Sequence, residues 1–83
     1  MSKGEIVEKV VRYVTEQIVD DTEAIQVELL DDGEDAVLAE VRTAKSDMGR
    51  VIGRRGRVAK AIRNIAGAAG EEEGLDVQVE FLD

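Results

Sequence analysis

The stretch Val51-Ile52-Gly53-Arg54-Arg55-Gly56-Arg57 decides the fold of this chain. Two glycines three positions apart follow a pair of apolar residues, and helical patterns lie on both sides of them. Because glycine adopts positive φ without a steric penalty, this spacing predicts a tight loop that ends one helix and begins the next.

The basic residues of the chain are concentrated around this loop. The stretch from Arg42 to Arg63 holds eight of the 11 lysines and arginines and a single acid, Asp47, so its formal charge is 8 − 1 = +7. The remaining residues hold three bases and 18 acids, a charge of −15, which gives the stated total of −8. A positive patch on an otherwise acidic chain predicts that a polyanion is held at one place and repelled elsewhere.

The loop has the chemistry that a nucleic-acid backbone needs. Glycines lack the Cβ atom that would keep a sugar-phosphate chain at a distance, and the helix after the loop directs free N–H groups outward. We expect Arg54 and Arg55 to contact phosphates, with the other basic residues supplying a surrounding field and Ile52 an apolar floor for unstacked bases. The predicted binding residues are Gly53, Arg54, Arg55, Gly56, Arg57, Lys60, Arg50, Arg63 and Ile52. The alternative is that the glycines only cap a turn between two helices.

The first half of the chain changes from a helical to a strand period. A capping box of Ser2 and Glu5 precedes apolar residues at helical spacing, which predicts an amphipathic helix from Glu5 to Val19. Alternating patterns at 25–30 and 37–42 predict two strands joined by the acidic turn 31–35. The acids of that turn lack the spacing of an EF-hand, so a solvated hairpin turn is the favoured interpretation over a calcium site.

The second half contains two helices and a strand. Ser46 and Asp47 predict the cap of a short helix that runs to Ile52. A longer helix follows the glycine loop, with a predicted apolar stripe of Val58, Ile62, Ile65 and Ala69. We expect residues 70–74 to form a loop and residues 77–82 a closing strand.

These elements predict one small α+β domain over residues 1–83, in the order α-β-β-α-(GxxG)-α-β. The second and third strands are joined through two helices, which is long enough for a right-handed parallel crossover. We therefore expect a three-stranded mixed sheet with the helices packed on one face and the odd-numbered apolar residues turned toward them.

The composition excludes most catalytic chemistry. The chain has no cysteine and no histidine, which removes disulfides, thiolate nucleophiles, the usual zinc sites and the commonest general base. We expect no enzyme activity, no cofactor, no metal and no small-molecule substrate. No apolar run is long enough to cross a bilayer and no signal segment is visible, so we expect a cytoplasmic location and no membrane contact.

The segment from Asp47 to Arg63 resembles the core of a K-homology (KH) RNA-binding domain, and the element order resembles the type II arrangement. The resemblance covers nearly the whole chain. A chain this short most resembles the bacterial stand-alone KH proteins of the KhpA type. It implies a single-stranded RNA-binding protein whose residues 53–56 clamp about four nucleotides, acting as an RNA chaperone or post-transcriptional regulator. It also implies pairing with itself or with a second, larger KH protein of the KhpB type, and a link to growth, cell shape and cell-wall synthesis.

Three further surfaces bear on this hypothesis. The acidic triplet Glu71-Glu72-Glu73 is expected to form one wall of the RNA groove and to repel phosphate. Leu30, Leu38 and Leu82 predict an apolar strip on the open face of the sheet, and the small residues 66–70 predict a second surface for close approach of a partner. The competing hypothesis is therefore a KH fold that serves dimerisation or docking and binds little RNA.

Overall fold

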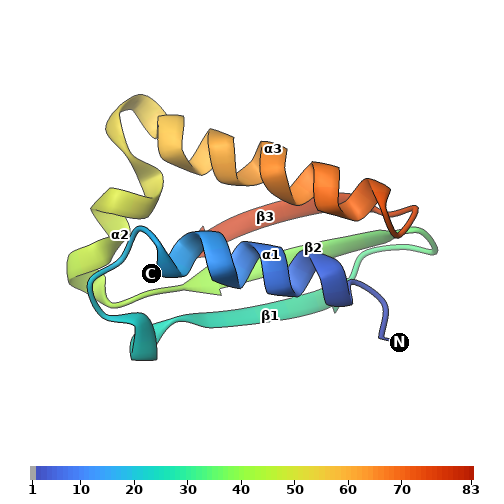
Figure 1. Ribbon diagram of the computed structural model, residues 1–83, viewed down its shortest axis with the longest axis horizontal. Coiled ribbons are helices and arrows are strands. Elements are labelled where there is room, and N and C mark those ends of the chain that lie inside the picture. Colours follow the sequence, from blue (N-terminus) through green and yellow to red (C-terminus); the bar gives the residue numbers. More distant parts are fainter. Residues whose placement is uncertain (1) are drawn as a thin grey trace.

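The computed structural model describes residues 2–83, which form a three-stranded sheet covered on one face by helices (Figure 1). The sheet order is β1-β2-β3, with β1 antiparallel to β2 and β2 parallel to β3. The predicted element order and mixed sheet are confirmed. Within residues 2–83 the elements are α1 (Glu5–Glu16), β1 (Gln26–Asp31), β2 (Ala36–Arg42), α2 (Lys45–Ile52), α3 (Arg57–Glu71) and β3 (Asp76–Leu82), with short 3-10 turns at Thr22–Ala24 and Arg54–Gly56.

The odd-numbered strand residues face the helices, as the alternation predicts. Val37, Ala39 and Val41 of the central strand are buried, and Ala39 and Val41 pack with Val79 of β3 and with α1 and α3. A smaller apolar cluster of Val19, Ile25 and Val51 lies between α2 and the connection from α1 to β1. This second cluster holds α2, and with it the glycine loop, against the rest of the molecule.

The open face of the sheet does not carry the predicted apolar strip. Leu30 pairs with Leu38 across β1 and β2, but the next row across the sheet consists of Glu28, Glu40 and Glu80. Leu82 lies in the row beyond, opposite Arg42. The strand register therefore separates Leu82 from the two other leucines by a row of charge.

Helix α1 differs from the prediction at both ends. It ends at Glu16 rather than Val19, because Ile18 and Val19 leave the helix to pack in the second cluster. The Ser2–Glu5 capping box is wrong: no side chain of its own segment caps the helix, and the carboxylate of Glu73 accepts hydrogen bonds from the backbone N–H groups of Gly4, Ile6 and Val7 at 3.1–3.3 Å. Because the capping residue lies 66 or more positions from the helix start along the chain, no local sequence pattern indicates it.

Helix α3 is longer than predicted, and its buried face is rotated. It includes Gly70, which was expected in the following loop, and ends at Glu71. Ile62 and Ala69 are buried as predicted, but the buried face is completed by Ala59 and Ala66, while Ile65 is 43% exposed. Small residues let the helix lie close to the sheet; a Cβ on Gly70 would lie 2.8 Å from the backbone O of Leu75. Because Ala66, Ala69 and Gly70 are used within the chain, the partner surface predicted at 66–70 is wrong in its larger part.

Candidate nucleic-acid interface

The glycine loop joins α2 to α3 through a single 3-10 turn. Gly53 has φ 76° and ψ 171°, Arg55 has φ 57° and Gly56 has φ 72°, so three of four consecutive residues have positive φ. The N–H of Gly53 donates to the O of Gly49 at 2.9 Å, which closes α2, and the N–H of Gly56 donates to the O of Gly53 at 3.1 Å. A Cβ on Gly53 would lie 2.9 Å from the backbone N of Val58, whereas nothing surrounds the same position of Gly56. Gly53 is therefore required by the fold, and Gly56 leaves the outer side of the loop open.

The side chains around the loop form an exposed basic surface. Arg54, Arg55, Arg57 and Lys60 are all exposed. Among residues 2–83, no acid lies within ion-pair distance of any of these four. No side chain caps the N-terminus of α3, so its first N–H groups and the positive end of the helix dipole face the same region. The arrangement suits a chain of phosphates.

Arg63 connects α3 to the edge of the sheet. Its Nε donates to the backbone O of Val79 at 3.2 Å, and its guanidinium carbon lies 5.5 Å from the centre of the Phe81 ring. The side chain is thereby held in one orientation while it remains exposed. Phe81 does not serve as an open stacking platform for a base, because Arg63 covers it.

Arg50, unlike the other basic residues of the interface, has an acidic partner. Its Nη1 lies 2.8 Å from Oδ1 of Asp20, in the connection between α1 and β1. The structure also places Ile52 at the surface, 36% exposed, beside the loop. All nine predicted binding residues thus lie on the segment formed by α2, the loop and the first two turns of α3. Two of them already have partners within the chain: Arg50 pairs with Asp20, and Arg63 donates to Val79.

Asp47 has a different role from the helix cap that its position predicts. The residue is only 2% exposed, and its two carboxylate oxygens accept hydrogen bonds from the backbone N–H groups of Asp20 and Asp21, both at 3.1 Å. These bonds hold the pKa of Asp47 below its ordinary value of 3.8. Asp47 therefore ties α2 to the connection that follows α1, across 26 or 27 residues of sequence, and its own helix begins without a side-chain cap.

Two acidic segments, residues 31–35 between β1 and β2 and residues 71–73 at the end of α3, lie at the end of the molecule opposite the glycine loop (Figure 1). There Lys3 binds the carboxylate of Asp31 at 2.8 Å, which together with the N–H of Gly33 lowers the pKa of Asp31. The triplet 71–73 lies at the C-terminal end of α3, and a helix of 15 residues separates it from the glycine loop by about 21 Å. That distance is more than two Debye lengths at physiological salt, about 8 Å each. The triplet therefore does not lie beside the glycines, and its predicted repulsion of phosphate does not extend to them.

Only one residue of the triplet borders a groove that reaches the basic surface. Glu71 and Arg63 both line a shallow groove between α3 and β3, about 12 Å apart along the helix. Glu73 points to the N-terminus of α1, where its carboxylate is fully used.

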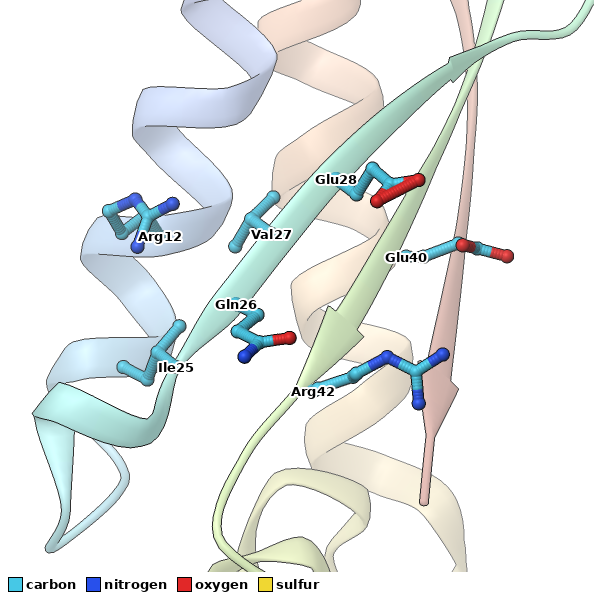
Figure 2. Close-up of a pocket in the computed structure, with 7 residues that line it drawn as sticks. All are labelled: Arg12, Ile25, Gln26, Val27, Glu28, Glu40 and Arg42. Carbon is cyan, nitrogen blue, oxygen red and sulfur yellow. The ribbon is translucent and has the colours of Figure 1, made fainter.

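A separate hollow lies along the exposed edge of β1, away from the glycine loop (Figure 2). Figure 2 shows that its lining comes from both sides of the strand: Arg12 and Val27 on the helix side, Glu28 and Arg42 on the open face. The hollow wraps around a strand edge and is lined by both signs of charge.

Comparison with known proteins places the chain in a family. The model of the KhpA/KhpB KH domain matches residues 8–81. A protein of Borreliella burgdorferi named RNA-binding protein KhpA is 35% identical over 90% of this chain and 90% of its own length. Proteins of the same name from Clostridium perfringens and Streptomyces coelicolor are 39% and 37% identical, over 89% and 94% of this chain and 97% and 94% of their own lengths.

A solved structure supports the fold independently. The structure of Era in complex with MgGDPNP and nucleotides 1506–1542 of 16S ribosomal RNA aligns with 92% of this chain at a TM-score of 0.65 and 16% identity. This chain spans only 30% of Era, so the likeness concerns one part of that protein and its fold alone. With the type II KH element order, the glycine loop and the family match on the same residues, the chain belongs to the KhpA/KhpB KH-domain family.

Proposed function

We propose that the chain binds single-stranded RNA by clamping its phosphate backbone at the glycine loop, and that binding rather than catalysis is its activity. The observation that carries the proposal is the loop itself, where Gly56 leaves open space and Arg54, Arg55, Arg57 and Lys60 are exposed with no acid in ion-pair distance within residues 2–83. The names of the relatives support RNA as the polyanion. The acidic segments 31–35 and 71–73 at the far end of the molecule would repel a polyanion there.

The expected affinity of one protomer is modest. Within residues 2–83 the only aromatic side chains are Tyr13 on α1 and Phe81, which Arg63 covers, so base stacking contributes little beside the loop. If the loop contacts about three phosphates of a single strand, the slope of log K against log salt is near −2, from about 0.7 per phosphate.

The test is to measure binding of a labelled single-stranded RNA by fluorescence anisotropy over a range of salt concentrations. We expect the double variant Arg54→Asp/Arg55→Asp to lose binding while its circular dichroism and melting temperature stay unchanged, since both side chains are exposed. Glu71→Lys/Glu72→Lys, which changes the charge by the same four units in the opposite sense at the far end, serves as the control for long-range electrostatics. Binding that does not depend on salt, or that survives the double arginine change, refutes the clamp.

Self-association, or pairing with a larger KH protein, is proposed as a second property. Tyr13 on α1 and Ile65 on α3, 62% and 43% exposed, are the two most exposed large apolar side chains among residues 2–83. α1 and α3 pack against each other on the same face of the sheet, so both exposed side chains belong to the helical layer. Sedimentation of the wild-type chain and of Ile65→Lys tests this surface; an unchanged monomer in both cases contradicts it.

The remaining expectations rest on the family resemblance. A cytoplasmic location, a role as RNA chaperone or regulator, and a link with cell shape and cell-wall synthesis stay predictions. Within residues 2–83, no helix has the length and apolar character needed to cross a membrane.

A further inference from the structure

We infer that Asp20 lowers the RNA affinity of the interface, because its carboxylate occupies the Arg50 guanidinium, which would otherwise be free to bind a phosphate oxygen. The inference rests on the proposed function and adds to it a residue outside the basic segment. It makes Asp20 a competitor of the RNA for one arginine.

Arg50 and Asp20 form a close, exposed ion pair. Nη1 of Arg50 lies 2.8 Å from Oδ1 of Asp20, and a phosphate oxygen would approach the same guanidinium at a similar distance. Both side chains are more than half exposed, at 56% for Arg50 and 76% for Asp20, so an incoming RNA can reach them. Arg50 lies on α2, one helical turn before the glycine loop.

The position of Asp20 is set by the buried carboxylate of Asp47. Asp47 binds the backbone N–H groups of Asp20 and Asp21, and Arg50 follows Asp47 by three residues on the same helix. The connection between α1 and β1 is therefore attached to α2 beside Arg50 whether or not the Asp20 side chain carries a charge. Changing Asp20 to Asn leaves its backbone N–H, and thus this attachment, in place.

Asp21 is a matched control for Asp20. Its backbone is held by the same carboxylate, its side chain is also exposed, and the structure gives it no ion pair among residues 2–83. Asp20→Asn and Asp21→Asn each raise the net charge by one, so long-range attraction for RNA increases equally in both. Any difference between the two variants reports the release of Arg50.

The experiment measures salt-dependent anisotropy of one labelled single-stranded RNA with the wild-type chain, Asp20→Asn and Asp21→Asn. An exposed ion pair is weak, so we expect Asp20→Asn to bind about two- to five-fold more tightly than Asp21→Asn. One additional phosphate contact makes the slope of log K against log salt steeper by about 0.7. In the Arg50→Gln background, Asp20→Asn is expected to lose its advantage over Asp21→Asn, which assigns the gain to Arg50.

Two results overturn the inference while the proposed function stands. In one, the wild-type chain binds RNA with the expected salt dependence, but Asp20→Asn and Asp21→Asn bind equally. In the other, the gain of Asp20→Asn persists in the Arg50→Gln background, so the charge acts on the RNA directly. If instead Arg54→Asp/Arg55→Asp retains full binding, the clamp itself is wrong and the inference falls with it.

Discussion

The two glycines of the loop are expected to tolerate alanine very differently. Gly53, at φ 76° and ψ 171°, occupies a backbone region reserved almost entirely for glycine, which costs another residue about 1–3 kcal/mol. A Cβ there also overlaps the side chain of Val58 and lies 2.9 Å from its backbone N, a second cost of about 1–3 kcal/mol because the start of α3 has to shift. The sum for Gly53→Ala is about 2–6 kcal/mol.

Gly56 has the same sign of φ but a different environment. At φ 72° and ψ 15° it is in the left-handed helical region, which costs alanine about 1–2 kcal/mol. Alanine recovers about 0.4–1 kcal/mol through the lower entropy of the unfolded chain, and no atom lies within 4 Å of the added Cβ. The neighbouring Arg55 already adopts a similar conformation at φ 57° and ψ 26°. The net cost of Gly56→Ala is therefore about 1 kcal/mol.

Urea unfolding followed by circular dichroism measures both values, with melting temperature as a second readout. For a chain of 83 residues each kcal/mol corresponds to about 4–8 °C, so we expect Gly56→Ala to melt about 5 °C and Gly53→Ala at least about 10 °C below the wild-type chain. Equal losses of stability for the two variants would refute the reasoning, because the difference rests on the contact with Val58 and on the value of ψ.

Three further predictions concern the rest of the fold. Glu73→Gln weakens the cap of α1 and is expected to cost about 1 kcal/mol of unfolding free energy, whereas Glu72→Gln, whose side chain is exposed, leaves the melting temperature unchanged. Asp47 has a lowered pKa, so its contribution to stability is complete above the unfolded value of 3.8 and is lost as pH falls through the lower folded value. Melting curves between pH 6 and about pH 2 are expected to show a shallower acid loss for Asp47→Asn than for the wild-type chain, and an identical acid profile would contradict this role. Ile62→Ala removes a side chain that is 2% exposed and is expected to lower the unfolding free energy by about 2–5 kcal/mol, while Ile65→Ala lowers it by less than about 1 kcal/mol. If urea unfolding gave the larger loss for Ile65→Ala, the assignment of Ile62 rather than Ile65 to the buried face would be wrong.

The comparison of Ile62 with Ile65 shows where periodicity is insufficient. Both residues fit an apolar stripe at helical spacing, and so do the alanines at 59 and 66. The sequence favours the larger side chains, because they bury more area. In the structure the alanines are buried instead of Ile65, because α3 lies close to both the sheet and α1 and only a small side chain fits at that distance.

The sequence by itself determined the type and order of the elements, the mixed sheet and the location of the basic loop. These follow from short-range chemistry: a period of two or 3.6 residues, the backbone freedom of glycine, and a count of charge along the chain.

Only the tertiary structure decided which partner each polar group has. It placed Glu73 on the N-terminus of α1, Asp47 on the backbone of Asp20 and Asp21, and the Asp20 carboxylate on Arg50. These contacts join residues 26 to 69 positions apart, and a carboxylate binds whichever N–H or guanidinium the folded chain brings within about 3 Å, a distance that no local pattern encodes.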